Sequence, residues 1–561
     1  MAHVCVAGQF VSGCSERLGS LSTLGLDLNE LVMHISENRA VELKIRYFPL
    51  QAKSEPKGCE NSGSDVLLGI SHQLGSLSEY TSESVFSLSW LESFIAFPPG
   101  FYSIACLVLL SLRTMAEAHR EPVGFFDSRI KDVKCRVYYQ WARTVLLLCI
   151  MILSVMSLFW ASQFRVPQKM HNLTVWVVDF DGQEETRHDV REDPIVGPAI
   201  MKVTHSMASV TTGLAYTIQS PADFNYDPQA LKQAVYDEHV YAAVIVSSNA
   251  TALLLHAVRN GDSSYRPTEA AQFVTISARD QTTYSTYIEP ALNTFEREVL
   301  GYFGPRWVEQ LAEQNTSSQL LQTNARQAIN PAIGFDRLDL RPFSPAVAIP
   351  AVTVGLIYLI ILAFFIFPFL MPVHMQLLKG NHPPLKTSHW VVWRITSNLA
   401  AYFFLAFSYS LVSLAFQIPF NNTPARGFES ALNPNAYGRG SFVVFWMLNW
   451  VGMAALGFPC ENMAMLLGAP YSSIFLIFWV ITNVSTGFYA LDLAPSFFRW
   501  GYAWPLHRIV EALRTILFGT HSRIGLDFGI LFAWVGVSIA LYPFANYVMQ
   551  WKQKRASRSP K

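Results

Sequence analysis

The sequence predicts a polytopic α-helical membrane protein with six transmembrane helices and an external α/β domain between helices 1 and 2. Apolar runs of about 20 residues, the length that crosses a bilayer core of about 30 Å, recur without interior clusters of acids or bases. One run stands alone at 144–162, and five more crowd the stretch 346–550. The polar stretch between them, 163–345, has about 180 residues and is long enough to bury its own core.

Residues 1–114 differ from the rest of the chain. Ser, Gly and Glu are scattered there among short apolar runs without a sustained period, and the run at 101–112 is too short to span a membrane. We expect a poorly ordered N-terminal extension. A mis-assigned start is the alternative hypothesis, because the chain from Met115 leads through a basic segment, 115–143, directly into the first apolar run.

The second group of apolar runs predicts five further transmembrane helices. Their expected bounds are 346–371, 390–417, 441–467, 471–491 and 528–550. Residues 497–526, before the last span, combine periodic apolar positions with Trp and Tyr, which favours an amphipathic helix at the external membrane interface. Surface anchoring and a role in handling lipid are both open for this helix.

Basic residues near the span ends predict the orientation, because Lys and Arg in short loops are retained in the cytosol. Three basic sets fall on one side of the membrane if there are six spans: the residues at 129–143, Lys379 with Lys386, and the tail 551–561. Both termini, including 115–143, are therefore expected in the cytosol. The arginines between the fifth and sixth spans do not fit this pattern.

Glycosylation acceptors agree with the same topology, since Asn-x-Ser/Thr is modified only where the chain enters the secretory lumen. Asn249, Asn315 and Asn421 carry the motif in segments that the topology assigns to the outside. Asn172 also carries it but lies too near the membrane to be used. The sequence therefore predicts a glycoprotein.

The external segment alternates strand-like and helix-like patterns, which is typical of an α/β layer. Strands are expected at 173–180, 214–219, 240–247 and 272–278, and helices at 193–208, 228–238, 250–258 and 282–300. None of the seven cysteines lies between 163 and 345, so this domain is expected to hold together without disulfides.

One motif resembles catalytic chemistry. An apolar strand ends in Asp179-x-Asp181-Gly, and phosphatases of the haloacid-dehalogenase type use such a pair as nucleophile and acid/base beside Mg²⁺. Gln183 stands where Thr or Ser is expected, no downstream acidic pair completes a metal site, and Asp-Gly is ordinary turn chemistry. We therefore predict no enzyme, no cofactor and no metal site, with a surface hydrolase as the weakest alternative.

Nucleotide and nucleic-acid chemistry are not indicated either. The segment 380–387 ends in Lys-Thr but has Leu385 where a phosphate loop needs Gly, and two prolines spoil its backbone cradle. The formal net charge is zero, which gives no reason to expect a nucleic-acid partner.

The predicted span interiors are nearly free of acids and bases, whereas ion-coupled carriers need such groups at membrane depth. Arg394 lies near the cytosolic end of the third span and can extend its charge to the interface. Glu461, beside Asn462, is either interfacial or a functional polar contact between helices. Asn483 is expected to join helices, while Arg508 and Arg514 are expected to face lipid phosphates or a partner. These six residues are the candidate functional polar positions.

Several long segments resemble the fungal nitrosoguanidine-resistance family, whose members resemble bacterial phage-infection proteins and the permease halves of a class of ABC exporters. The order of parts is similar: one span, a large external α/β domain and five further spans. The segments that carry the resemblance, which extends from about Met115 to Trp551, are HNLTVWVVDFDG (171–182), PIVGPAI (194–200), YAAVIVSSNATALL (241–254), RPFSPAVAIPAVTVGLIYLIIL (341–362), NHPPLK (381–386) and YFFLAFSYSLVSLAFQIPF (402–420).

The resemblance implies a plasma-membrane protein linked to resistance against toxic compounds and to the distribution of phospholipids between leaflets. Permease halves of this design pair and work with an ATPase, so it also implies a homodimer and a separate ATPase or membrane scaffold as partner. The leading hypothesis is an exporter-like protein that handles amphipathic drugs or membrane lipids. The alternative is a non-transporting scaffold or regulator of lipid asymmetry.

Overall fold

The computed structural model describes residues 124–182, 193–210, 212–313, 325–378, 382–383 and 385–558. They belong to one compact unit, Gly124–Lys561, which contains a bundle of long apolar helices and a five-stranded sheet with its own helices. The predictions for residues 1–114, Lys379 and Asn315 lie outside the described residues.

Five helices among the described residues are long and apolar enough to cross a membrane: Ser128–Ser162, Ala346–Met375, Thr387–Ala415, Gly438–Leu467 and Ile524–Arg555. The protein is therefore a polytopic helical membrane protein. The remaining predicted span, 471–491, is a shorter apolar helix, α15 (Tyr471–Gly487). Its 17 residues extend about 26 Å at 1.5 Å per residue, slightly less than the bilayer core.

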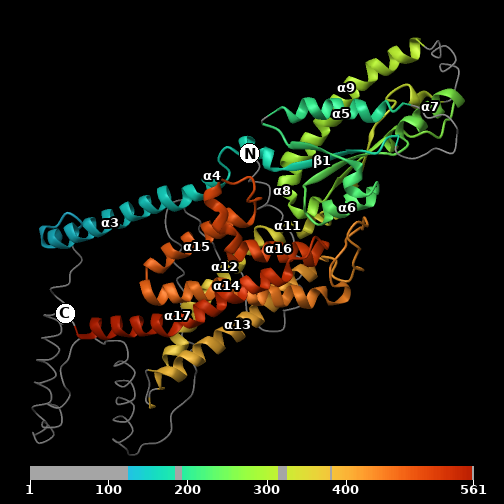
Figure 1. Cartoon of the computed structure of the whole chain (residues 1–561). Helices are drawn as coiled ribbons and strands as arrows, with labels where there is room; N and C mark the ends of the chain where they lie inside the picture. Colours follow the sequence, from blue (N-terminus) through green and yellow to red (C-terminus); the bar gives the residue numbers. More distant parts are fainter. Residues whose placement is uncertain are drawn as a thin grey trace, which may run out of the picture. The chain divides into compact units, whose positions relative to one another are not determined.

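Most helices of the bundle come from the second half of the chain (Figure 1). Before the sheet the chain forms α3 (Lys131–Met151), a π-helical turn (Ile152–Met156) and α4 (Ser157–Ser162). After the sheet come α11 (Ile349–Val352), α12 (Gly355–Met375), α13 (Thr387–Ala415), α14 (Ser441–Leu467), α15, α16 (Pro505–Phe518) and α17 (Ile524–Arg558).

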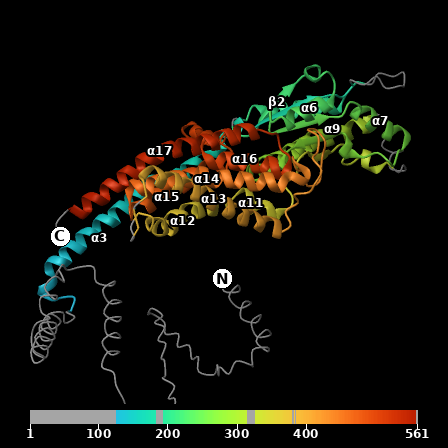
Figure 2. The same ribbon diagram turned by 90° about the horizontal axis from the view of Figure 1, so that it is seen from below.

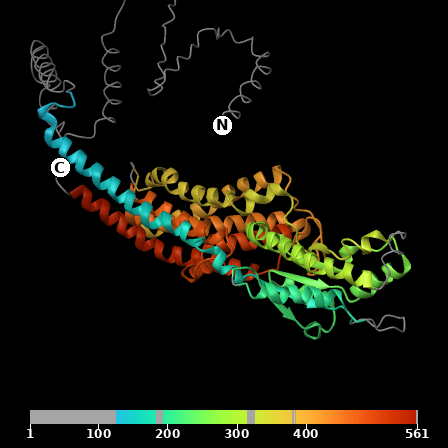
Figure 3. The ribbon, with the colours of Figure 1, turned by 90° about the horizontal axis from the view of Figure 1, so that it is seen from above.

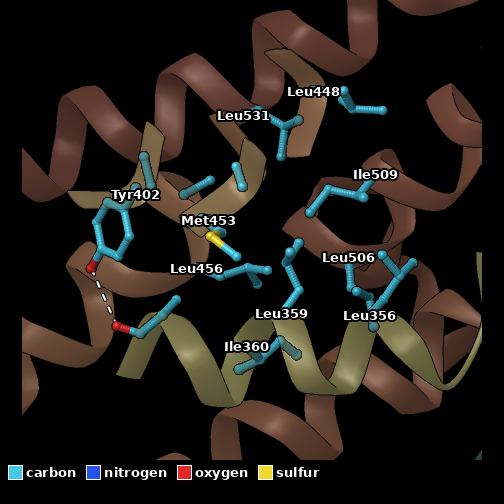
Figure 4. Packing of buried hydrophobic residues seen from close by; sticks show 14 of the residues in the cluster. Leu356, Leu359, Ile360, Tyr402, Leu448, Met453, Leu456, Leu506, Ile509 and Leu531 are labelled. Atoms are coloured by element: carbon cyan, nitrogen blue, oxygen red, sulfur yellow. Dashed lines mark hydrogen bonds between the residues drawn. The ribbon is translucent and has the colours of Figure 1, made fainter. Parts of the chain in front are cut away.

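Helix α14 lies at the centre of the bundle, since 67% of its most apolar stretch is buried. Met453 and Leu456 of α14 belong to one apolar core with Leu359 of α12, Ile509 of α16 and Leu531 of α17, and Figure 4 shows these side chains pointing toward one another. Branched and long aliphatic side chains fill the space between the helices, which is how van der Waals packing holds helices together in lipid.

The continuous helical segment Ser128–Ser162, which contains α3 and α4, differs from α14, because only 6% of its most apolar stretch is buried. Long apolar side chains are exposed along this segment, such as Leu146 and Ile150 of α3 and Leu153 of the π-helical turn. Figure 3 shows α3, in cyan, as one long helix that leads toward the sheet. A helix this apolar and this exposed needs an apolar solvent, which supports its assignment as a membrane span.

The sheet has the strand order β2-β1-β3-β4-β5. Its strands are β1 (Thr174–Asp179), β2 (Ala215–Gln219), β3 (Ala242–Val246), β4 (Ala271–Thr275) and β5 (Phe335–Asp339). β1 pairs in parallel with β2 and β3, β4 runs antiparallel to β3, and β5 is parallel to β4. The four predicted strands are present. β5 is not predicted from its sequence, because FDRLD is rich in charge and poor in β-branched residues.

Helices cover both faces of the sheet: Figure 1 shows α9 above it and α6 below it, and Figure 2 shows α6, α7 and α9 together with β2 at one end of the protein. One face packs against α5 (Val196–Ala208), α7 (Ala250–Asn260) and α9 (Glu289–Glu313), and the other against α6 (Pro228–Tyr236). Successive residues of β1 point to opposite faces, so Val177 joins the first core and Val178 the second. The predicted α/β layer is therefore present.

The segment 497–526 is not the single helix that the sequence predicts. It forms a short 3-10 helix, η13 (Ser496–Ala503), and then α16, which ends where Gly519 takes a left-handed φ of 67°. Helix α16 is buried on nearly all sides, because it packs against α14, α15 and α17. Its Trp and Tyr neighbours form an interfacial pattern, but tertiary packing covers the helix.

Candidate functional site

A buried ion pair lies inside the helix bundle. Arg394 of α13 pairs with Glu461 of α14, and each side chain is only 2% exposed. Asn398 donates its side-chain amide to the other oxygen of Glu461. The hydroxyl of Tyr542 on α17 donates to Oε1 of Glu461 over 2.7 Å. Three helices therefore meet at one carboxylate.

Helix geometry places this pair away from the ends of both helices. Arg394 comes seven residues after Thr387, the first residue of α13, and Glu461 six residues before Leu467, the last residue of α14. At 1.5 Å per residue both charges lie about 10 Å from the helix ends. Arg394 therefore does not extend its charge to the surface, and this part of the sequence prediction is wrong. For Glu461 the sequence left two alternatives open, and the structure shows the polar contact between helices, because the two side chains pair in the interior.

The polar cluster continues around the pair. Asn462 donates to the carbonyl of Ser538 on α17 over 2.8 Å, and Trp390 donates to Oδ1 of Asn546 over 3.3 Å. Four buried atoms of the cluster have no hydrogen-bond partner among the described residues: Arg394 Nε, Asn398 Oδ1, Asn462 Oδ1 and Asn546 Nδ2. Each unpartnered group costs about 1–3 kcal/mol. The cluster therefore contains buried donors and acceptors that are not used by the described residues.

Asn483 joins α15 to α16. Its amide donates to the carbonyl of Trp479 over 2.8 Å, and its Oδ1 accepts from the backbone N–H of Leu506 over 3.1 Å. Leu506 is in the first turn of α16, where backbone N–H groups have no partner within the helix. Asn483 thus serves as a capping residue supplied by a neighbouring helix.

Arg508 and Arg514 point into the protein and not toward lipid phosphates, which corrects the expectation from the sequence. Arg508 donates to Oδ1 of Asp527 over 3.3 Å, with Asp527 fully buried. Arg514 pairs with Glu511 over 3.0 Å and with Asp280, from the loop after β4, over 3.7 Å. Because both cations have carboxylate partners, α16 brings charge into the interior without leaving it uncompensated.

Arg341 connects the sheet to the bundle, and it is not among the residues predicted from the sequence. It is fully buried and lies two residues after the end of β5. Its guanidinium donates to five backbone carbonyls, those of Leu340, Ala425, Arg426, Glu429 and Gly519. The carbonyl of Gly519 belongs to the turn after α16. A planar group with five N–H donors suits this task, and Lys could not replace it.

Further contacts join the same turn to the sheet domain. Arg523 pairs with Glu238 over 3.1 Å, and His521 lies 3.3 Å from Asp237. The hydroxyl of Tyr236 donates to Gly519, the same carbonyl that Arg341 holds, over 3.3 Å. Burial raises the pKa of Glu238, and Arg279 and Arg523 oppose that shift. The end of α16 is thus held by the helix and loop that follow β2.

Asp181, from the motif that resembles a phosphatase site, has a structural role in the described residues. Its carboxylate accepts from the N–H groups of Gly197 and Thr251 over 3.1 and 3.0 Å, at the first turns of α5 and α7. Asp179 accepts from the N–H of Asp181 over 2.9 Å. Burial raises the pKa of Asp179 to about 6. Asp181 thus caps the first turns of α5 and α7.

The remaining predicted sites lie as follows. Among the described residues no three or more His, Cys, Asp or Glu side chains come close enough to hold a metal ion. Asn421 is exposed and Asn249 is half-buried at the start of α7. Asn398 and Tyr542 are functional candidates that the sequence patterns do not single out, although Asn398 lies one turn from Arg394 and could have been found by that spacing.

Comparison with known proteins gives a family but no activity. A family model described as "Protein of unknown function (DUF3533)" matches residues 144–540. An uncharacterized endoplasmic reticulum membrane protein of Saccharomyces cerevisiae is 25% identical over 451 residues, which cover 77% of this chain and 84% of that protein. No solved structure matches. Because the family model covers more than half of the chain, including the second part of the first apolar helix, the sheet domain and most of the bundle, the chain belongs to the DUF3533 family.

Proposed function

We propose that this protein is an exporter-like protein of the plasma membrane that handles amphipathic drugs or phospholipids. The carrying observation is the connection from the sheet domain to the polar cluster of the bundle. Arg341 holds the turn after α16, α16 packs against α14 and α17, and those two helices supply Glu461 and Tyr542. A change in the sheet domain therefore has a packed route to the buried ion pair.

The ion pair supports a transport role because charges inside membrane bundles are costly and usually serve substrate or ion pathways. Arg394 and Glu461 are hydrogen-bonded on several sides, yet atoms of the same cluster have no partner among the described residues. Two arrangements of similar energy are what a transporter needs in order to alternate between states. We propose that the cluster acts as such a switch, and the efflux of variants at Arg394 and Glu461 tests this role.

The proposed topology has six spans with both termini in the cytosol and the sheet domain outside. Helix α15, at 17 residues, is at the lower limit of spanning length and supplies the extra crossing. Exposed Asn421 and half-buried Asn249 are the proposed glycosylation sites among the described residues. Protease added to sealed vesicles should cleave the sheet domain and spare a tag after Lys561. Digestion of that tag with protection of the sheet would refute the topology.

The activity is tested in cells with and without the protein. Efflux of rhodamine 6G and binding of annexin V at the cell surface report drug export and aminophospholipid exposure. The export hypothesis predicts slower efflux in cells that lack the protein, and the Arg394→Met variant should show the same slow efflux. The variant Arg394→Met/Glu461→Met then shows whether efflux depends on the charges of the pair or on the packing around it. Arg297→Ala changes an exposed side chain of α9; it is the matched control and should keep wild-type efflux. Wild-type efflux in the deletion would refute export.

A non-transporting scaffold or regulator of lipid asymmetry is the second proposal, and the mutual neutralisation of Arg394 and Glu461 favours it. An ion pair whose charges neutralise each other can hold α13 and α14 together in a single arrangement. The regulator predicts altered annexin V binding with unchanged efflux. Purification in mild detergent adds a further test, because export proposes a homodimer with a separate ATPase, and regulation proposes a scaffold partner.

Location and catalysis are also proposals. The yeast relative carries the name of an endoplasmic reticulum membrane protein, so that membrane is the alternative to the plasma membrane for this chain. A C-terminal fluorescent fusion separates the two.

We further propose that the protein is not an enzyme, since Asp181 caps two helices. Loss of resistance in a stable Asp179→Asn variant would contradict that proposal.

A further inference from the structure

The sheet domain contains a groove between the start of α5 and the second half of α9. Its volume is about 370 Å³, within the lower range of small-molecule sites. Phe303 and Trp307 of α9 line it, and they are themselves 4% and 2% exposed because most of each ring packs in the core of the domain. Ile195 and Ala199 line the opposite side. The groove therefore has apolar side chains on both sides.

Among the described residues, the charged side chains that line this groove are two cations, Lys202 of α5 and Arg306 of α9. Arg306 is held in place, because its guanidinium lies 3.6 Å from the ring centre of Tyr302 and donates to the Tyr302 carbonyl over 2.9 Å. One N–H group serves that carbonyl, and a guanidinium has five. The others can bind an anionic oxygen beside Lys202 without losing the stacking contact.

We propose that this groove binds a small anionic amphipath, specifically a single-chain carboxylate such as a medium-chain fatty-acid anion. The acyl chain would contact Phe303, Trp307 and Ala199, and the carboxylate would lie between Lys202 and Arg306. The volume favours one chain, and a two-chain phospholipid is too large for it. Charge complementarity selects an anion over a cationic amphipath of equal length.

This inference deepens the proposed function by naming a ligand class for the sheet domain, and it rests on the proposed function only for what happens after binding. Binding at the groove and transport through the bundle are measured separately. Loss of efflux with intact binding would remove the transport proposal alone, and intact efflux with no binding would remove the groove alone.

The binding experiment uses the full chain in detergent and a photoreactive diazirine derivative of dodecanoate. After illumination, mass spectrometry quantifies labelled peptides from α5 and α9, so that labelling of the apolar membrane helices does not enter the result. Unlabelled dodecanoate should compete at these peptides at least about tenfold better than dodecyltrimethylammonium, which carries the same chain with a cation. Equal competition would overturn the proposal.

Two variants test the two halves of the site. Lys202→Glu/Arg306→Glu should reduce labelling of α5 and α9 by about tenfold or more through reversed charge, and Ala199→Trp should reduce it by filling the groove with the cations intact. Lys202→Arg and Arg297→Glu are matched controls, because the first keeps the charge and the second lies on α9 outside the lining. All variants must keep the wild-type melting temperature. Wild-type labelling in stable Ala199→Trp, or in the stable double variant, would refute the site.

Discussion

The sheet domain and the helix bundle each contain an Arg–Glu ion pair, and the two pairs differ in their surroundings. Arg337 and Glu296 of the sheet domain lie 2.8 Å apart with side chains 46% and 24% exposed. Arg394 and Glu461 of the bundle are both 2% exposed. Water reaches the first pair and screens the attraction between its charges. The second pair is solvated only by protein groups, so losing one of its two charges should cost much more folding free energy than at the exposed pair.

The largest expected effect is loss of one partner of the bundle pair. Arg394→Met leaves Glu461 charged and unpaired in the interior, which should lower the free energy of unfolding by about 3–5 kcal/mol. Size-exclusion chromatography after heating in detergent would show this as a lower apparent melting temperature and a smaller folded fraction. Arg394→Met/Glu461→Met, which removes both charges, should recover most of that loss. A double variant as unstable as the single one would break the comparison between the two pairs.

The next effect concerns the connection between the two regions. Arg341→Lys keeps a positive charge but cannot donate to five carbonyls, so we expect a loss of about 2–4 kcal/mol. Hydrogen exchange should rise at β5 and at the turn around Gly519 more than at the buried strand β3. Arg426→Lys, an exposed side chain whose carbonyl and not its guanidinium binds Arg341, is the control and should leave exchange unchanged. Uniform exchange across the chain would show that Arg341 does not localise the connection.

Asp179→Asn should stabilise the sheet domain. Burial raises the pKa of Asp179 from 3.8 to about 6, so the folded state holds its proton more tightly than the unfolded state and loses stability as pH rises between these values. Above about pH 6 the neutral amide should give a gain of about 1–2 kcal/mol, after allowance for partial solvent screening. The gain should vanish below about pH 4, where both states are protonated.

Thermal melting between about pH 4 and pH 8 tests this prediction. Asp262→Asn is the matched control, because Asp262 is exposed and hydrogen bonds from Ser264 lower its pKa. It should give no gain at neutral pH. A gain for Asp179→Asn that persists unchanged at acidic pH would show that the effect does not come from the charge.

The smallest effect is expected at the exposed pair of the sheet domain. Glu296→Gln removes the charge opposite Arg337 but leaves an amide oxygen that still accepts its hydrogen bond. We expect about 0.5 kcal/mol or less, and less again at high salt. Urea unfolding followed by hydrogen exchange at α9 would measure it. A cost equal to that of Arg394→Met would mean that exposure does not separate the two pairs.

The sequence predicts regular elements better than polar contacts. Four strands and most helices of the sheet domain follow from local patterns such as LTVWVVDF, because the side-chain period is read within one segment. β5 carries no such local pattern, since FDRLD becomes a strand only by pairing with β4. Helix α16 is the reverse case, because a clear local pattern there predicts the wrong environment. Its aromatic and basic neighbours indicate an interfacial surface, yet α14, α15 and α17 cover it.

Arg394 illustrates why the candidate site is only partly predictable. Its position in an apolar run singles it out, and Glu461 is singled out in the same way. No local sequence pattern indicates that two residues 67 positions apart form an ion pair, or that Asn398 and Tyr542 hydrogen bond to the same carboxylate. Arg341 is harder still, because its partners are backbone carbonyls from two distant loops, and carbonyls carry no sequence signal.

The sequence by itself determined that this chain lives in a membrane and that an α/β domain interrupts its apolar runs. Hydrophobicity and side-chain period are properties of short segments, so they can be read without the fold. Only the tertiary structure decided which charges are neutralised, which helix is enclosed and which arginine ties the sheet to the bundle. Those outcomes depend on distances between segments far apart in the chain, and the energy of a charge depends on what surrounds it.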